Sequence, residues 1–226
     1  MSDDSPTNAE QPSLDRPAPP EGSLWNEPAY VLLARTASSS PTPGGGSMSA
    51  MAGAYGLALV VMGLEISAAR EDAHPDLPAV LADARTHLLN VLRHPDADVR
   101  AFEGYIHALH LPRGTAEEKA ARTAARADAA RYAIRAPLSS ARDLNAALDL
   151  AVHAAPLAHR HVVSDVGAGA HLIHGAIHAT LLNVDINVGS LPEEERASAR
   201  EERDEVAREA DRLHAHVTAL VRERLR

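Results

Sequence analysis

The sequence predicts an all-α fold, a bundle of roughly seven to nine helices. Apolar residues make up 45% of its 226 residues but aromatic residues only 3%, so the core must be built from Ala, Leu, Val and Ile. Alanine dominates this set, and alanine is the strongest helix former. No stretch alternates apolar and polar residues with the period of two that marks a half-buried strand.

We predict that residues 1–23 form a disordered tail and that residues 24–226 form a single helical domain. The tail alternates prolines with acidic residues, a composition that offers no apolar surface to bury. It lacks the basic start and the apolar stretch of a signal peptide. Residues 24–36 then place apolar side chains at helical spacing and predict a short amphipathic helix that opens the domain.

A loop over residues 37–46 precedes the least polar segment of the chain. Two prolines and three consecutive glycines prevent a helix in this loop. Ser47 is expected to cap a helix over residues 47–68, which carries no charge before Glu65 and repeats small residues four apart. The repeat favours close packing against a neighbouring helix. Because the segment is rich in Gly, Ala and Ser, we predict a buried helix rather than a membrane span.

Six further helices are expected, each bounded by a cap or a proline. They cover residues 77–92, a helix capped by Asp96 or Asp98 that ends at Leu111, then residues 115–135, 137–153, 164–188 and 190–226. Thr115 and Glu118 form a capping-box pattern. The last helix aligns an apolar stripe at 4-3-4-3 spacing, made of Val206, Ala210, Leu213, Val217 and Leu220.

Charge and cysteine content exclude several classes of protein. The net charge of −9, from 31 acidic and 22 basic residues, argues against a nucleic-acid coat or a basic membrane-surface protein. Lys119 is the only lysine, so any cationic pocket must be built from arginine. The absence of cysteine excludes disulfides, thiolate metal sites and a cysteine nucleophile. We therefore predict a cytoplasmic protein with no nucleic-acid or membrane partner.

The first candidate site is the glycine-rich end of the loop, where Pro43, Gly44, Gly45 and Gly46 precede Ser47. A bare backbone at the start of a buried helix leaves amide N–H groups free to bind an anionic or polar ligand group. The alternative is that the glycines only allow tight packing. The segment lacks the lysine and the spacing of a Walker phosphate-binding loop.

The second candidate site begins at Asp165, near the start of the helix expected over residues 164–188. A carboxylate at that position is either a helix-start charge or an acid/base group. Towards the other end of the same helix, Asn183 and Asn187 are four residues apart and share one face. Buried side-chain amides need hydrogen-bond partners, from another helix or from a ligand.

The 13 histidines raise the question of a metal site. His171, His174 and His178 lie on one helical stripe, and the last two have the i, i+4 spacing of paired ligands. The sequence points to no third ligand. Packed or surface histidines are therefore the expected interpretation, and we predict no metal and no cofactor.

Several motifs occur in an order that resembles one known family. They are SPTPGGGS opening an Ala/Gly helix, Ala101-Phe102 ahead of Leu111-Pro112, Pro137-Leu138 opening a helix, and SDVG followed by a helix that ends NVxIN. Over about residues 24–191, in one register, the chain is similar to the formimidoyltetrahydrofolate cyclodeaminase / methenyltetrahydrofolate cyclohydrolase family. The PTPGGGS and SDVG strings are each fairly specific, and finding both at this separation strengthens the resemblance.

The resemblance implies a folate one-carbon enzyme, an intertwined homodimer or dimer of dimers whose folate sits between subunits near the glycine-rich loop. It acts on N5-formimidoyl- or 5,10-methenyltetrahydrofolate. Asp165 matches the family's SD motif, residues 43–47 match its loop, and Asn183 and Asn187 match the polar end of the later helix. We expect Asp165 to move protons at the reacting carbon. An arginine such as Arg135, Arg131 or Arg70 would hold the carboxylates of the folate tail.

One departure from the family pattern keeps a second interpretation open. Relatives carry neutral polar residues and then lysines after the first long helix, whereas this chain has Glu65 and then Arg70. An added acid near the folate carboxylates would be unfavourable. The alternative is a non-catalytic folate-binding protein, or a dimeric helical interaction protein of the same fold.

Overall fold

A computed structural model describes residues 19–226, and this part of the chain contains helices and no strand. The α-helices are α1 (Ala29–Thr36), α2 (Gly45–Ala68), α3 (Leu77–Val91), α4 (His94–His110), α5 (Ala116–Leu157), α6 (Val163–Asn187) and α7 (Glu193–Arg224). Short 3-10 helices at Leu24–Asn26 and Val188–Ser190 precede α1 and α7. The predicted all-α fold is confirmed.

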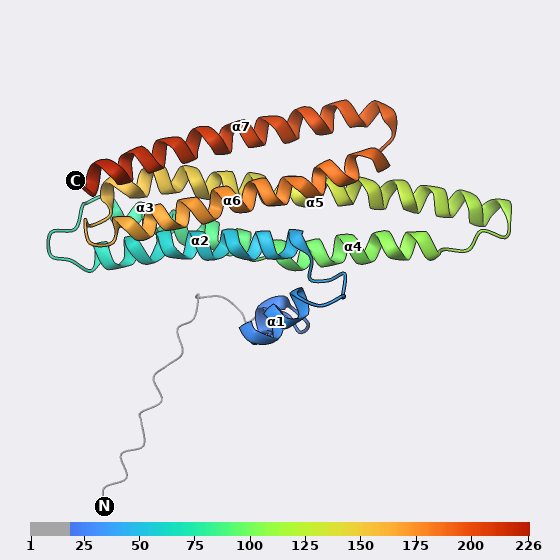
Figure 1. Cartoon of the computed structure of the whole chain (residues 1–226), viewed down its shortest axis with the longest axis horizontal. Helices are drawn as coiled ribbons and strands as arrows, with labels where there is room; N and C mark the ends of the chain where they lie inside the picture. The colour runs from blue at the N-terminus through green and yellow to red at the C-terminus, as the bar shows by residue number, and fades with distance from the viewer. Residues whose placement is uncertain (1–18) are drawn as a thin grey trace, which may run out of the picture.

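The long helices lie side by side along the long axis of the molecule (Figure 1). α2 packs against α6, α6 packs against α5, and α7 covers α5 and α6. α3 and α4 pack against α2 and α5, and the short α1 lies beside the start of α2. The centre of the core contains fully buried side chains from three helices, Leu57 and Leu64 of α2, Leu144 and Leu148 of α5, and Ile173 and Ile177 of α6.

α2 is a core helix, as predicted. By length and composition it could cross a membrane, but 61% of its most apolar 18-residue window is buried inside the bundle. It runs antiparallel to α6, because Gly53 faces Ala176 near one end of the pair while Gly63 faces Val166 near the other. The start of α2 therefore lies beside the end of α6.

The two helices touch backbone to backbone where Gly56 meets Gly169. A Cβ on Gly56 would lie 2.7 Å from the carbonyl oxygen of Gly169, and a Cβ on Gly169 would overlap the carbonyl oxygen of Gly56. No real Cβ makes so close a contact with a backbone atom, so this separation of the helices requires glycine on both sides. The close packing predicted from the repeat of small residues is confirmed.

α5 departs most from the prediction. Separate helices were expected over residues 115–135 and 137–153, but α5 is one continuous helix of 42 residues that contains Pro137 and Pro156. A proline removes one backbone hydrogen bond. The buried side chains of Ile134 and Leu138, on either side of the first proline, hold the helix against the core through that point.

The ends of several helices are also informative. The capping box predicted at Thr115 and Glu118 is present at the start of α5. Pro28 splits the helix predicted over residues 24–36 into a 3-10 turn and α1. In α7 the predicted stripe is buried from Val206 to Val217, but Leu220 is only partly buried and Val221 takes the next core position.

The predicted caps of two helices were wrong. Gly44 is the N-cap residue of α2, so Ser47 lies inside the helix and is fully buried. α4 begins at His94, with a proline in its first turn, and neither Asp96 nor Asp98 caps it. All three side chains instead form hydrogen bonds to residues far away in the sequence.

Residues 1–18 of the predicted tail lie outside the described part of the chain. Ser23, at the end of that tail, is buried, and its hydroxyl donates a hydrogen bond to Asp96 at 2.6 Å. The folded domain therefore begins slightly before Leu24.

We predict that Gly169→Ala lowers the free energy of unfolding by about 1–3 kcal/mol, because its Cβ must push α2 and α6 apart. Gly104→Ala in α4 is the matched control, since a Cβ at Gly104 meets no atom within 4 Å. The control should be neutral or slightly stabilising. Urea unfolding followed by circular dichroism measures both, and equal effects of the two substitutions would contradict the backbone contact.

Candidate functional site

A cavity of about 240 Å³ lies where the start of α2 meets α4, α5 and the end of α6. Its lining residues are Pro41, Thr42, Gly44, Gly45, Gly46, Asp98, Ala101, Phe102, Tyr105, Ala133, Pro137, Asn183 and Asn187. The cavity thus unites the glycine-rich loop with the two asparagines, which are far apart in the sequence. The antiparallel packing of α2 on α6 brings these two segments together.

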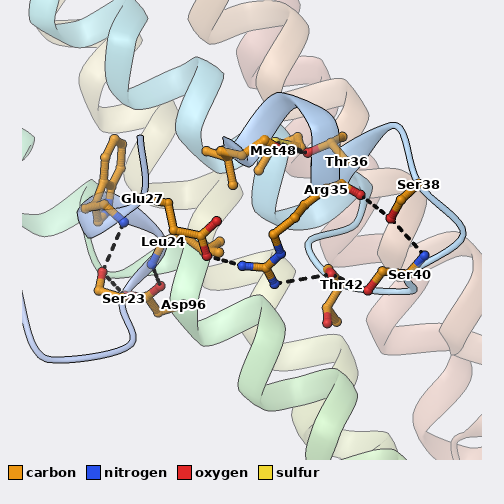
Figure 2. A network of polar contacts seen from close by, with 12 residues as sticks. Ser23, Leu24, Glu27, Arg35, Thr36, Ser38, Ser40, Thr42, Met48 and Asp96 are labelled. Carbon is orange, nitrogen blue, oxygen red and sulfur yellow. Dashed lines mark hydrogen bonds and ion pairs between the residues drawn. The ribbon is translucent and has the colours of Figure 1, made fainter. Parts of the chain in front are cut away.

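The loop before α2 is held by side chains of its own and of α1 (Figure 2). Arg35 of α1 forms an ion pair with Glu27 and also reaches the carbonyl oxygen of Thr42 at 3.5 Å. The hydroxyl of Ser40 donates to the same carbonyl oxygen at 2.7 Å. These contacts fix the backbone at Thr42, which forms one wall of the cavity.

Asp96 anchors the N-terminal segment on α4. Its carboxylate accepts hydrogen bonds from the Ser23 hydroxyl at 2.6 Å and from the backbone N–H of Leu24 at 2.9 Å (Figure 2). The indole N–H of Trp25 donates to the carbonyl oxygen of Leu92 at 2.7 Å. Through these bonds α4 and the end of α3 position the segment that leads into α1, and α1 positions the loop.

Asp98 is the only carboxylate that lines the cavity among the described residues. Its Oδ2 accepts a hydrogen bond from the hydroxyl of Ser47 at 2.8 Å. Its carboxylate fills the space where a side chain at Gly46 would begin, so the glycine is required for the close approach. Burial raises the pKa of the Asp98 carboxyl, and hydrogen bonds from Ser47 partly oppose that rise.

The predicted asparagines present acceptors to the cavity. The Asn183 amide nitrogen donates to the carbonyl oxygen of Thr180 at 3.3 Å, and that of Asn187 donates to the carbonyl oxygen of Asn183 at 2.8 Å. One of the two N–H donors of each amide is therefore used within α6. The side-chain oxygens, which form no hydrogen bond within residues 19–226, are left to accept from a ligand.

Pro137 adds a further acceptor. A proline has no N–H to give to the residue four positions earlier, which is Ala133. Both residues line the cavity. The continuous α5 thus places a backbone carbonyl without its helical donor beside the asparagines, and a ligand N–H can satisfy it.

Four predicted site residues do not line this cavity. Pro43 and Ser47 are neighbours of lining residues in the loop and the first turn of α2, whereas Arg135 and Asp165 lie farther away. Arg135 lies on the side of α5 that faces α7, in a separate groove of about 480 Å³, with its guanidinium 5.5 Å from the centre of the Tyr132 ring. Asp165 lies in the first turn of α6. At 1.5 Å per residue, it is about 27 Å along the helix from Asn183.

The other arginines considered for the folate tail are already paired. Arg131 forms ion pairs with Glu195 and Asp128, and Arg70 forms one with Asp72. Arg70 also follows the end of α2, so it lies at the end of the bundle opposite the cavity. Of the three arginines considered for binding the folate tail, Arg135 is the remaining candidate.

Sequence reasoning missed Asp98 as a site residue and assigned it to a possible helix cap. The local sequence carries no sign of its true partner, because Ser47 lies 51 residues earlier in the chain. Its position four residues before Phe102, in the stretch that carries the Ala101-Phe102 motif, is the one signal that could have pointed to it. Ala101, Phe102 and Asp98 line the same cavity.

Comparison of the sequence with known protein families shows the family to which the chain belongs. The family model described as formiminotransferase-cyclodeaminase matches residues 28–206. The chain belongs to the formiminotransferase-cyclodeaminase family. The resemblance predicted from the sequence motifs is confirmed, and the match contains the loop, the cavity and the whole of α6.

Individual members of the formiminotransferase-cyclodeaminase family differ in length. The methenyltetrahydrofolate cyclohydrolase of Methylorubrum extorquens is 34% identical over 179 residues, which cover 78% of this chain and 85% of that protein. The formimidoyltransferase-cyclodeaminase of Sus scrofa is 32% identical over 178 residues, which cover 76% of this chain but only 32% of that protein. The chain thus spans about a third of this longer relative.

A solved structure shares the fold. The formiminotetrahydrofolate cyclodeaminase of Thermotoga maritima aligns with a TM-score of 0.77 at 20% sequence identity, covering 89% of this chain and 98% of that one. The helical arrangement described above is therefore the fold of this family rather than a peculiarity of one chain.

Proposed function

We propose that this protein is a folate one-carbon enzyme that hydrolyses 5,10-methenyltetrahydrofolate to 10-formyltetrahydrofolate. The observation that carries the proposal is the cavity at the start of α2, which a half-buried carboxylate, Asp98, lines together with Asn183 and Asn187. Of the two sequence relatives described above, the one matched over most of its own length is a cyclohydrolase. Cyclodeamination of N5-formimidoyltetrahydrofolate is the second candidate, supported by the names of the longer relatives and of the solved structure.

The chemistry suits a carboxyl group with a raised pKa. The methenyl bridge is a cationic carbon between N5 and N10, and water attacks it with loss of one proton. A second proton transfer, to N5, accompanies opening of the ring, which leaves the formyl group on N10. Asp98 would accept and return these protons and balance the cation. Burial shifts its pKa towards the range in which a carboxyl serves as both base and acid.

The size and lining of the cavity fit part of a folate. Its volume of about 240 Å³ is smaller than the roughly 300–1,000 Å³ typical of sites that enclose a whole drug-sized ligand. The pterin ring carries N–H donors, which match the oxygens of Asn183 and Asn187 and the carbonyl of Ala133. No cation lines the cavity within residues 19–226. The glutamate tail would therefore extend outside the cavity, and its carboxylates would need an arginine there, which we propose to be Arg135 of one of the two subunits.

In cyclodeamination the same carboxyl would act on a different leaving group. N10 attacks the formimidoyl carbon on N5, and ammonia leaves as the methenyl bridge closes. The departing nitrogen must gain a proton, which a protonated Asp98 would supply. Both reactions pass through a carbon that is bonded to N5 and N10, so one cavity can serve both.

We further propose a homodimer. Two adjacent helices expose apolar stripes, Tyr55, Met62 and Ile66 on α2 and Leu172, Leu182 and Ile186 on α6. Leu182 and Ile186 are 62% and 79% exposed, which is unusual for large aliphatic side chains gathered on one face. A second copy would cover this face. It would also offer its own Asp165, which the first chain cannot bring to its cavity.

The non-catalytic alternative was motivated by Glu65, which is paired with an arginine of its own chain. Glu65 forms an ion pair with Arg85, with 2.5 Å between Oε1 and Nη2. It lies about 30 Å along α2 from the glycine-rich start of that helix. The acid that departs from the family pattern therefore does not enter the cavity of its own chain. A cytoplasmic location, without nucleic-acid or membrane partners, remains our proposal from charge and cysteine content.

Turnover of pure protein tests the function. Loss of the methenyl absorbance of 5,10-methenyltetrahydrofolate should exceed the uncatalysed rate and saturate with substrate. Supplying N5-formimidoyltetrahydrofolate and measuring released ammonia tests the second candidate. Binding of folate without either turnover would favour the non-catalytic alternative, and no binding would favour a helical interaction protein.

We predict that Asp98→Asn lowers turnover by about a hundredfold or more, because the variant cannot exchange a proton. Its free energy of unfolding at pH 7 should not fall. The native pKa is raised, so the wild type loses stability relative to the variant as pH rises through that pKa. Asp165→Asn is the matched substitution, and it should reduce turnover only if the partner's helix supplies that carboxylate.

Wild-type turnover in Asp98→Asn, with a large loss in Asp165→Asn, would move the acid/base role to Asp165. Loss of activity in both variants, with both folded, supports a site shared between two subunits. Because Asp165 lies in the first turn of α6 and does not cap it, a purely structural role predicts unchanged activity and a loss of stability of at most about 1 kcal/mol from the removed helix-start charge.

For assembly, we predict a homodimer by light scattering at micromolar concentration. Leu182→Glu should shift the protein towards monomer, because it places a charge on the apolar face of α6. Leu225→Glu is the control, since Leu225 is similarly exposed, at 57%, but follows the end of α7. A monomeric wild type would refute the assembly, and dissociation by both variants would refute the assigned face.

A further inference from the structure

A cluster of imidazole and carboxylate groups lies between α6 and α7, outside the cavity described above. It contains His171, His174 and His178 of α6, and Asp211 and His214 of α7. None of these residues lines the folate cavity. The two α7 residues also lie beyond residue 206, where the match to the family model ends.

Asp211 supplies the third ligand that the sequence could not identify. One of its carboxylate oxygens, Oδ1, lies 2.8 Å from Nε2 of His174 and 2.9 Å from Nε2 of His178. The three potential ligand atoms lie within 4.8 Å of one another. The two histidines come from successive turns of one helix, and the carboxylate comes from a neighbouring helix, so both α6 and α7 are needed to form the group.

We propose that His174, His178 and Asp211 bind a divalent transition metal ion, with zinc as the best match to two imidazoles and one carboxylate. Zinc binds imidazole nitrogen at about 2.0–2.1 Å and carboxylate oxygen at about 2.0–2.2 Å in tetrahedral geometry. Ligand atoms of such a site lie roughly 3.3 Å apart, which follows from those bond lengths. The contacts to Asp211 must therefore open by about half an ångström, and solvent fills the fourth position.

The surroundings allow that adjustment. The side chains of His174, His178 and Asp211 are 24%, 38% and 63% exposed, so they can move without disturbing the core and an ion can reach them from solvent. On the next turn the ring of His214 stacks on that of His174, with centroids 4.1 Å apart and planes 13° apart. Nε2 of His214 lies 2.8 Å from Nδ1 of His171. The pair of His171 and His214 therefore restricts the movement of the His174 ring.

A metal ion at this site would stabilise the packing of the C-terminal helix, α7, against the core. α7 carries many charged residues, and its contact with α6 depends on the stripe of small and aliphatic side chains described above. A metal ion that bridges the two helices stabilises their packing by the free energy of binding to the folded chain. The role is structural and does not depend on whether the folate cavity is catalytic.

Isothermal titration of the full-length, chelator-treated protein with zinc chloride tests the proposal. We expect one zinc ion per chain, and about tenfold or greater loss of affinity in His178→Ala and in Asp211→Asn. His153→Ala in α5 is the matched control. His153 also has a carboxylate four residues earlier, Asp149, with 3.8 Å between Nε2 and Oδ2, but residues 19–226 offer it no third ligand. The control should bind zinc as the wild type does.

Thermal unfolding gives an independent readout. Zinc should raise the unfolding midpoint of the wild type and of His153→Ala, and should leave the double variant His174→Ala/His178→Ala unchanged. Circular dichroism without zinc checks that the variants fold. Absence of zinc binding by the wild type would overturn the proposal. Unaltered affinity in the double variant, or equal loss in His153→Ala, would overturn the assignment of ligands.

Discussion

The contact between α2 and α6 at Gly56 and Gly169 is the constraint on which the rest of the structure depends. With no side chain on either residue, the two backbones meet directly. The direction of the pair then places the start of α2 against the end of α6. Since the glycine-rich loop leads into the first and the asparagines end the second, this one contact positions both halves of the candidate site.

A second constraint is the partial burial of Asp98 against that helix start. Removing a carboxylate from water disfavours its charged form. Ser47, and the N–H groups at the first turn of α2, oppose this by offering hydrogen bonds and a positive helix end. The same balance leaves a carboxyl whose proton is more easily retained than usual. The group is thus less favourable for stability than a neutral residue and better suited to proton transfer.

Much of the fold and part of the site could be predicted from the sequence. Alanine content and the lack of alternation indicate the all-α class, and the string of glycines and the Asn183/Asn187 pair indicate two walls of the cavity. Local sequence patterns gave wrong predictions where contacts between residues far apart in the sequence determine the structure. Pro137 suggested a helix end, but α5 continues through it because its neighbours Ile134 and Leu138 are buried in the core, and Ala133 and Pro137 line the cavity.

The pairs that cross between helices could not be predicted. Ser47 with Asp98 and His174 with Asp211 are separated by 51 and 37 residues, and no local pattern joins them. Asp165 illustrates the reverse case. Its motif is recognisable in the sequence, but the geometry of one chain places it at the opposite end of α6 from the asparagines. Sequence motifs therefore indicate which segments belong to a functional site, but the packing of the helices determines which of these segments lie close together.

The central claim is that the cavity beside Asp98 receives the pterin and its one-carbon unit. A crystal structure with 5-formyltetrahydrofolate, which keeps a one-carbon unit and is stable, tests this most directly. The account predicts the pterin between the glycine-rich loop and Asn183, with the Asp98 carboxylate about 2.6–3.2 Å from the one-carbon unit or a water next to it. A ligand bound elsewhere, with Asp98 still facing an empty cavity, would contradict the account.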